Sequence, residues 1–437
     1  MPSTVGALGL ECLMNRANIY FTSGYRFAGP LDTDALCASY NALLDATEKF
    51  SQRLHFSAQT DYQWRPAPQH RHFRVIDSND IERDFAELCR QSLELSDEEK
   101  HSAMALTVLR QNGSNEFIIA QTCEHTYVDA RSAECLFNRL IEHYNAGLRR
   151  DQPRQQAVLS AAATTRTAAL EEMLPLLDLD EPTHQRNLAG LGTYPVADDG
   201  AYAIPLAAVP GHLGEYRKQR FAPVSRHLPL AALVERCRRH NPEVTRNSVI
   251  CAALAKGFYE QNRREKQLPE KQTISFKMLS DLLPPDVRER YCGNYIAFVP
   301  VSVDGELPIE QIAEQIHRRI REFKDQKIDA SLFRAVEDAV RQGVVGTSDD
   351  ALSFVVTNWN NYRFLQQPDF LHGCTSLRHQ SGVNISPRDT LGAVLVNRPI
   401  LVINESPRDE VCLSFFPSLR AEAENIALAN RIAAHFV

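Results

Sequence analysis

The sequence feature that most constrains the fold is a β-hairpin that leads into a histidine and then into a long helix. Residues 105–110 and 116–121 are apolar runs with β-branched side chains, and the Gln-Asn-Gly-Ser-Asn segment between them is typical of a hairpin turn. The second run leads to His125, and apolar side chains recur with helical spacing over 130–148. This order of elements indicates an α/β fold with His125 and Asp129 at the loop between strand and helix.

The loop carries residues suited to proton transfer. A histidine takes up and returns a proton near neutral pH, and a carboxylate four residues later can fix the loop or the ring by pairing inward. The same His-x-x-x-Asp spacing also arises by chance, so spacing alone does not establish catalysis. Cys123 shares a face of the strand with His125, but no group that would orient the histidine toward the thiol is visible, and a Cys/His nucleophile is therefore disfavoured.

Composition excludes several classes of function. The 437 residues are 43% hydrophobic and 24% charged, with a net charge of −7 and no run of Lys and Arg, so nucleic acid is not an expected partner. The ten cysteines form no Cys-x-x-Cys pair and His70 and His72 have no third ligand nearby, so neither disulfides nor a metal site is expected. No secretory leader and no membrane-spanning apolar run are apparent, which predicts a cytoplasmic location without membrane contact.

The chain is organised as two similarly built halves. Each half opens with a predicted strand followed by a predicted helix, at 18–27 and 31–50 and again at 221–228 and 230–240. The segment between the halves is rich in Ala, Thr, Gln, Pro and Gly, with one helical patch. The predicted division is an N-terminal domain at 1–150, a crossover linker at 151–216 and a C-terminal domain at 217–437.

The second half carries several polar stretches at the ends of predicted strands. These are Pro284-Pro285, Gly293-Asn294, Thr357-Asn358-Trp359 and residues 369–373. The half is predicted to close with an antiparallel set of strands at 392–396, 400–405 and 410–415, followed by a last helix from about residue 419.

Together with the His125 loop, these stretches resemble the motifs of the His-x-x-x-Asp acyltransferase superfamily, which has the chloramphenicol acetyltransferase-like fold. The resemblance runs nearly end to end and is closest to BAHD and fungal-type O-acyltransferases, with condensation domains as relatives. Residues 29–36 resemble the opening of the first helix, and Pro284-Pro285 with Gly293-Asn294 resemble the Pro-Pro…Gly-Asn segment. Residues 357–359 resemble the Thr/Ser-Ser-Trp strand end, and 369–373 stand in the place of Asp-Phe-Gly-Trp-Gly.

The sequence also departs from the pattern of the superfamily. Condensation domains usually have two adjacent histidines and a glycine after the aspartate, whereas this chain has Glu124 and Ala130. This difference favours ester transfer or freestanding amide transfer over a peptide-synthetase condensation domain. The arginine that usually pairs with the motif aspartate is missing before the Pro-Pro, and Lys277 is the nearest substitute.

The resemblance implies two chloramphenicol acetyltransferase-like αβ domains, with mixed sheets flanked by helices and an active-site tunnel at their interface. By the same resemblance, His125 is the general base that deprotonates the acceptor as it attacks a thioester, without an acyl-enzyme. Asp129 holds the loop, and the hydroxyl of Thr357 donates to the oxyanion. Expected on the substrate side are Asn294, Trp359, Asp369 and Gly373.

The implied co-substrate is an acyl thioester on coenzyme A or on phosphopantetheine, with no permanently bound cofactor and no metal. The implied acceptor is a small alcohol or amine, an acyl carrier protein is a further candidate partner, and a monomer suffices. Two alternatives stay open at the level of sequence. One is a freestanding condensation-type amide synthase that uses carrier-protein thioesters, and the other is a catalytically silent scaffold or docking member of the fold.

Overall fold

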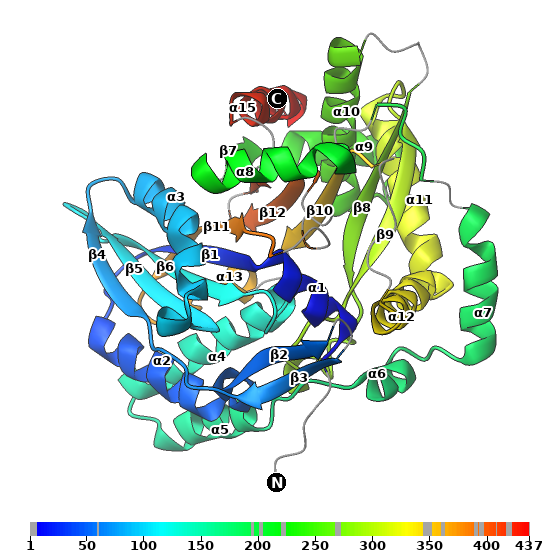
Figure 1. Cartoon of the computed structure of the whole chain (residues 1–437). Coiled ribbons are helices and arrows are strands. Elements are labelled where there is room, and N and C mark those ends of the chain that lie inside the picture. Colours follow the sequence, from blue (N-terminus) through cyan, green and yellow to red (C-terminus); the bar gives the residue numbers. More distant parts are fainter. Residues whose placement is uncertain are drawn as a thin grey trace.

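The chain forms two lobes, each built on one β-sheet (Figure 1). The structure is a computed structural model that describes residues 7–58, 61–193, 196–200, 204–219, 224–266, 272–343, 352–359, 363–388, 392, 397–407, 409–416 and 422–436. The first sheet has the strand order β11-β1-β6-β5-β4 and the second has the order β7-β13-β12-β10-β8-β9. We call each sheet with its helices the first lobe and the second lobe.

The first sheet is antiparallel except for one pair. Only β4 and β5 run parallel. The other neighbouring pairs, β11 with β1, β1 with β6 and β6 with β5, are antiparallel. Its strands are β1 (Ile19–Ala28), β4 (Phe73–Ser78), β5 (Met104–Gln111), β6 (Glu116–Glu124) and β11 (Thr375–Ile385). A separate hairpin consists of β2 (Gln52–Ala58) and β3 (Asp61–Pro66).

The second sheet has a parallel centre. β10 is parallel to β8 on one side and to β12 on the other, and the flanking strands are antiparallel. Its strands are β7 (Val224–Pro229), β8 (Thr273–Asp281), β9 (Ile296–Asp304), β10 (Phe354–Trp359), β12 (Ile400–Ser406) and β13 (Glu410–Phe416). The chloramphenicol acetyltransferase-like expectation of mixed sheets is confirmed. The predicted antiparallel pairing of the closing strands is confirmed for β12 and β13, and β12 also pairs in parallel with β10.

Helices cover both faces of the first sheet. Successive side chains of its strands point to opposite faces, and apolar side chains on each face pack against helices. Tyr25 and Ile119 point toward the core beneath α2 and α4, while Ile118 and Ala120 on the opposite face pack against Phe85 of α3. The helices of this lobe are α2 (Thr33–Ala46), α3 (Ile81–Gln91), α4 (Ala130–Leu148) and α5 (Gln152–Ala163). The predicted helix at 130–148 is confirmed in both of its bounds.

The second lobe is completed by helices packed on its sheet, whereas the short α13 (Arg363–Gln366) packs through Phe364 into the core of the first lobe. Its helices are α9 (Ala231–His240), α10 (Arg246–Lys266), α11 (Ile309–Asp325), α12 (Ile328–Arg341) and α15 (Glu422–Ala433). No helix among the described residues is long and apolar enough to cross a membrane.

The crossover contains more helix than the sequence predicts. Besides α6 (Leu170–Leu176), which matches the predicted helical patch, it holds α5, α7 (Glu181–Gly190) and α8 (Val209–Gln219). In Figure 1, α6 and α7 run along the outside of the molecule toward the second lobe. The predicted strand at 392–396 lies outside the described residues apart from Gly392, and β7 is described only from Val224.

The N-terminal helix α1 (Gly9–Ala17) lies between the two lobes (Figure 1). The buried carboxylate of Glu337, on α12, accepts hydrogen bonds from the backbone N–H groups of Gly9 (2.5 Å) and Leu10 (3.1 Å). Glu11 of α1 forms a buried ion pair with Lys49 of the first lobe at 2.6 Å. The helix is therefore bonded to both lobes.

Candidate active site

His125 follows the last residue of β6, at the centre of the first sheet. Its backbone N–H donates to the carbonyl oxygen of Ile19 (2.9 Å), which continues the pairing with β1 by one residue. The imidazole lies edge-on to the ring of Phe21, with centroids 5.2 Å apart. Its Nδ1 atom is buried and has no hydrogen-bond partner of normal geometry among the described residues, although the residue as a whole is partly exposed. Nε2 is not among the buried atoms without a partner.

The imidazole of His125 is neutral at physiological pH. Burial lowers the pKa of His125 below its ordinary 6.5, although its own carbonyl oxygen, Asp129 and Asn294 act in the opposite direction. A neutral imidazole has a free lone pair, which is what a general base requires.

Asp129 is the N-cap of α4 and holds the motif loop. Its carboxylate accepts hydrogen bonds from the backbone N–H groups of Ser132 (2.7 Å) and Tyr295 (3.0 Å) and pairs with the guanidinium of Arg288. The expectation of Lys277 as the basic partner is wrong. Arg288 follows the Pro-Pro pair instead of preceding it, and the one-turn helix at Arg288–Arg290 brings its side chain back to α4.

The charge on Asp129 is stable in this buried position. Burial raises the pKa of the carboxyl, but the pairing with Arg288 and the two backbone hydrogen bonds outweigh it and hold the pKa of Asp129 below its ordinary value. Arg288 also lies 3.8 Å from Asp281. Asp129 therefore has its hydrogen-bonding capacity filled by the protein, which indicates a structural role.

Asn294 holds the backbone of the same loop. Its Nδ2 donates to the carbonyl oxygens of His125 (2.8 Å) and Thr126 (3.4 Å). The preceding Gly293 accepts at its carbonyl oxygen from the backbone N–H of Asp129 (3.0 Å). The Gly-Asn segment of the second half thus fixes the histidine loop of the first half, and Asn294 touches that loop directly.

Thr357 and Trp359 lie at the end of β10, facing the first lobe. The Trp359 indole N–H donates to Thr357 Oγ1 at 3.0 Å. Because Oγ1 accepts this bond, its own hydroxyl proton is left for another acceptor. The ring of Phe21 contacts Trp359 edge-on, with centroids 5.5 Å apart, as well as His125. Phe21 therefore contacts both His125 and Trp359.

A cavity of about 320 Å³ lies between the lobes beside Thr357 and Trp359, and His125 and Phe21 are not among its lining residues. We call it the slot. The first lobe contributes Ala130 and Arg131 at the start of α4, and the second lobe contributes the ends of β8 and β10 and one side of α11. Thr357 and Trp359 both line it.

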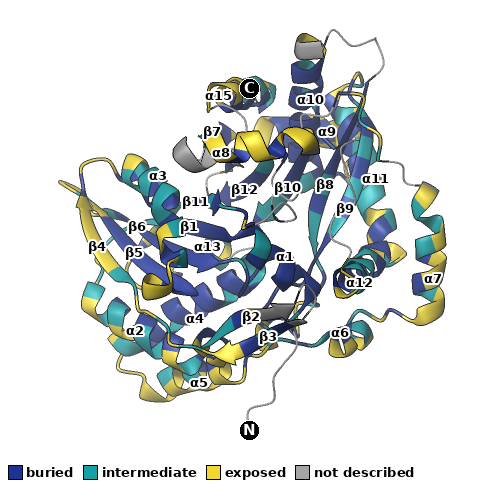
Figure 2. Ribbon diagram, in the orientation of Figure 1, coloured by how far each residue is buried: buried dark blue, intermediate teal, exposed yellow. Residues whose placement is uncertain are grey.

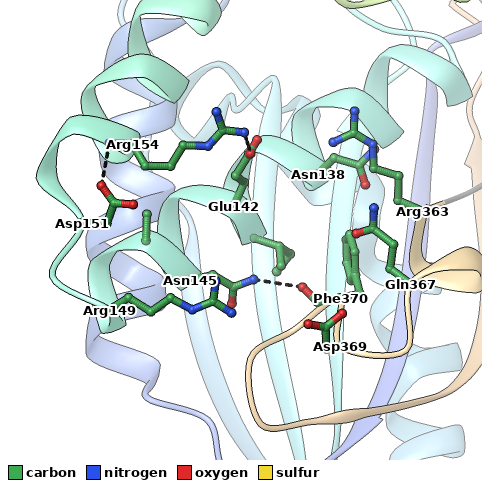
Figure 3. A pocket seen from close by; sticks show the side chains of 12 residues that line it. Asn138, Glu142, Asn145, Arg149, Asp151, Arg154, Arg363, Gln367, Asp369 and Phe370 are labelled. Atoms are coloured by element: carbon green, nitrogen blue, oxygen red, sulfur yellow. Dashed lines mark hydrogen bonds and ion pairs between the residues drawn. The ribbon is translucent and has the colours of Figure 1, made fainter.

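Asp369 and Gly373 lie elsewhere. Their segment packs on the last turns of α4, where Asn145 donates to the carbonyl oxygen of Phe370 (3.0 Å) and accepts from the backbone N–H of His372 (3.0 Å). Asn145 is about 22 Å along the helix from Ala130 at 1.5 Å per residue. Asp369 faces a separate surface pocket of about 410 Å³, shown in Figure 3, which shares no lining residue with the slot.

Phe21 and Arg288 are site residues that the sequence did not single out. Phe21 lies within a strand and Arg288 within a charged turn. In the sequence, each therefore looks like an ordinary structural residue. The signal for Arg288 is that it is the first basic residue after Pro284-Pro285. Figure 2 shows that β1 and β6 are almost entirely buried and that most of α4 is buried as well. No cluster of metal-ligating side chains occurs within the described ranges.

Comparisons with known proteins identify the fold. The first condensation domain of the calcium-dependent antibiotic synthetase superposes with a TM-score of 0.67 at 14% identity, over 100% of this chain and 96% of that one. The trichothecene 15-O-acetyltransferase of Fusarium sporotrichioides superposes with a TM-score of 0.69 at 12% identity, over 99% and 94%. The starter condensation domain of rhizomide synthetase, in complex with C8-CoA and Leu-SNAC, gives 0.64 at 10% identity, over 99% and 93%.

No protein-family model matches the sequence, and no curated protein matches it. The structural likeness nevertheless spans both lobes and nearly the full length of each neighbour. The chain therefore has the two-lobed α/β fold of condensation domains and of this acetyltransferase, in agreement with the resemblance of its motifs to the His-x-x-x-Asp acyltransferase superfamily.

Proposed function

We propose that the protein is an acyltransferase that moves an acyl group from a thioester to the hydroxyl or amine of a small acceptor. The observation that carries the proposal is a neutral His125 whose loop is fixed by Asn294 and whose ring contacts Phe21. Phe21 also contacts Trp359, which donates to the hydroxyl oxygen of Thr357. Acyl transfer from a thioester needs a base and an oxyanion donor, and we propose His125 and Thr357 for these two roles.

In the proposed mechanism, His125 Nε2 removes the proton of the acceptor as its oxygen or nitrogen attacks the thioester carbonyl carbon. The carbonyl oxygen becomes an oxyanion, which accepts a hydrogen bond from Thr357. The C–S bond then breaks as the carbonyl re-forms, and the imidazolium returns its proton to the departing thiolate. Both substrates meet at one site, so much of the rate comes from positioning.

No covalent acyl-enzyme is required in this mechanism. Cys123 is the thiol nearest in sequence to His125, and its side chain is fully buried in the core of the first sheet. Burial raises its pKa well above the ordinary value, so Cys123 stays a protonated thiol. Direct attack by the acceptor is the simpler route.

The donor is proposed to be a thioester of coenzyme A or of phosphopantetheine on a carrier protein. A solved neighbour is a starter condensation domain with C8-CoA and Leu-SNAC, which supports an acyl thioester as donor and keeps amide formation as the second candidate reaction. A silent scaffold is disfavoured, because a buried base costs stability that a scaffold has no need to lose.

The test measures free thiol released from a panel of acyl-coenzyme A and acyl-pantetheine donors with pooled alcohols and amines. We expect acceptor-dependent release by the wild type and by His143→Ala, and none by His125→Ala. His143 is a matched control, a buried histidine on α4 bonded to Ser39 and outside the site. Release that survives in a folded His125→Ala variant would remove His125 as the base, and the absence of release with every donor would refute acyl transfer.

A further inference from the structure

The slot occupies a fork between two parallel strands. β8 and β10 are hydrogen-bonded from the Phe276–Phe354 pair to the Met278–Val356 pair, and their pairing ends there. The residues that follow on both strands, 279–281 and 357–359, line the slot. The carboxyl ends of parallel strands are where open α/β sheets commonly bind ligands.

Residues whose side chains lie on opposite faces of the sheet line the slot. Successive side chains of a strand point to opposite faces. Thr357 and Trp359 face the first lobe, whereas Asn358 and Met278 face the helices of the second lobe, yet all four line the slot. A group that enters beside Thr357 can therefore reach the space between the sheet and α11.

The wall of the slot on the α11 side is apolar. It consists of Met278 and Val299, which are register partners on β8 and β9, and of Ile320 and Phe323 on α11. An aliphatic chain buried against such a wall gains about 0.8 kcal/mol for each methylene removed from water.

The polar groups that flank this wall are mostly bonded to one another. Ser280 donates to Asp329 (3.0 Å), and Lys324 pairs with Asp329 (2.8 Å). Asn358 Nδ2 donates to Asn247 Oδ1 (2.9 Å), while Asn358 Oδ1 is buried without a partner in the described part of the chain. Arg131 and Asp281, which also line the slot, lie 4.0 Å apart as a charged pair. The wall is therefore suited mainly to an apolar ligand.

Reaction geometry indicates which part of the substrate would enter. The tetrahedral carbon carries the oxyanion, the attacking acceptor atom, the sulfur and the acyl chain. The oxyanion is proposed to bond Thr357, and the acceptor atom lies near His125. We propose that the slot binds the acyl chain of the thioester and limits its length. This inference rests on the proposed function for the identity of the ligand.

The volume of the slot sets the size class of the acyl group. At about 320 Å³ it is near the lower end of ligand pockets, which span roughly 300 to 1,000 Å³. The fit is to an unbranched aliphatic acyl group of short to medium length, threaded between β8 and β10.

The test measures binding, which needs no turnover, by calorimetry with S-alkyl pantetheine thioethers from ethyl to hexadecyl. For the wild type we expect affinity to rise about fourfold per methylene until the slot is full and then to level off. Ile320→Trp, which narrows the slot at a partly exposed position of α11, should level off at a shorter chain. Ile320→Ala should level off at a longer one.

The matched control is Leu332→Trp. Leu332 is also partly buried against the core of the second lobe but does not line the slot. Its chain-length profile should equal that of the wild type. The inference is overturned if Ile320→Trp keeps the wild-type profile, or if affinity does not depend on chain length. Because thiol release is measured separately, failed acyl transfer with an intact chain-length profile would refute the proposed reaction and leave the slot assigned.

Discussion

At the level of single residues, the candidate site is a histidine whose backbone is fixed from both lobes. Ile19 accepts from its N–H, and Asn294 donates to its carbonyl oxygen. Neither bond uses the imidazole itself, so the ring stays available for a proton. Its depressed pKa also sets the pH range over which it can act.

The first prediction concerns this pH range. Activity requires neutral His125, so kcat/KM should fall as the pH drops through the pKa of the free enzyme, which burial places below 6.5. We expect full activity at neutral pH and an acidic limb in the profile below 6.5. The measurement is kcat/KM against pH with both substrates well below saturation. An acidic limb centred above 6.5 would contradict a desolvated base.

The second prediction concerns the hydroxyl of Thr357. Thr357→Val keeps the shape of the side chain and removes the oxyanion donor, so kcat should fall by about a hundred- to a thousand-fold with little change in KM. Thr357→Ser keeps the hydroxyl and should retain most of the activity. Steady-state kinetics of the two variants distinguish hydrogen-bond donation by Thr357 from its packing. Equal losses of kcat in both variants would show that Thr357 acts only through packing.

The third prediction concerns Arg288. Arg288→Ala leaves Asp129 as a buried carboxylate without its cation, and breaking such a pair costs about 3–5 kcal/mol in the free energy of unfolding. Arg288→Lys keeps the charge and should cost less. Urea denaturation followed by circular dichroism gives both values. A loss below about 1 kcal/mol in Arg288→Ala would mean that the pair does not hold the loop.

At the level of elements, α1 connects the two lobes through hydrogen bonds and an ion pair. Glu337 of the second lobe bonds the first N–H groups of α1, and Lys49 of the first lobe bonds both Glu11 and the carbonyl oxygen of Cys292. Cys292 directly precedes Gly293 and Asn294, which fix the histidine loop. A continuous set of bonds therefore runs from α12 through α1 and Lys49 to the candidate site.

The fourth prediction follows from Glu337. Burial raises its pKa from 4.5 to about 7, although the hydrogen bonds from Gly9 and Leu10 oppose the shift. The folded state thus holds a proton that the unfolded chain releases, and the free energy of unfolding should fall by up to about 3 kcal/mol as the pH rises from 4.5 to 7. Glu337→Gln should lose this component of the pH dependence. Denaturation midpoints across this range test it, and identical slopes in both proteins would contradict it.

The sequence predicted some elements well and others poorly, for physical reasons. The helix at 130–148 has a continuous apolar stripe, and its bounds were correct. β11 was not predicted, because polar residues such as His379 and Ser381 interrupt it. They are buried between the lobes, where Ser406 Oγ accepts from the N–H of His379 and Asn404 donates to Ser381. Such bonds depend on distant segments and leave no local pattern.

The same contrast holds within the candidate site. His125 and Asp129 lie four residues apart, so their shared loop was evident from sequence. Arg288 reaches Asp129 across 159 positions, and only the folded chain shows that it replaces Lys277 as the partner. The catalytic role of Thr357 and the substrate-binding roles of Asn294, Trp359, Asp369 and Gly373 stay predictions.

At the level of the whole molecule, the two halves of the sequence contribute elements to each other's lobe. β11 comes from the second half of the sequence yet pairs along β1 over its full length from Ile19 to Ala28. α1 in turn bonds α12 of the second lobe. The sequence division at 1–150, 151–216 and 217–437 stays a prediction about domains, and the pairing of β11 gives it a direct test.

The fifth prediction is that the halves do not fold separately. A fragment of residues 1–216 lacks β11 and exposes the edge of β1, so it should aggregate or melt without a cooperative transition. The full chain should unfold in one transition by both circular dichroism and tryptophan fluorescence. A soluble 1–216 fragment with a sharp transition would instead establish an autonomous N-terminal domain.

The late position of β11 also has a consequence for synthesis on the ribosome. About 250 residues separate the end of β6 from the start of β11. At a translation rate of roughly 5–20 residues per second, β1 waits on the order of tens of seconds for its second neighbour. During this time the nascent first sheet has an open edge, which makes the chain a natural client of chaperones that shield unpaired strands.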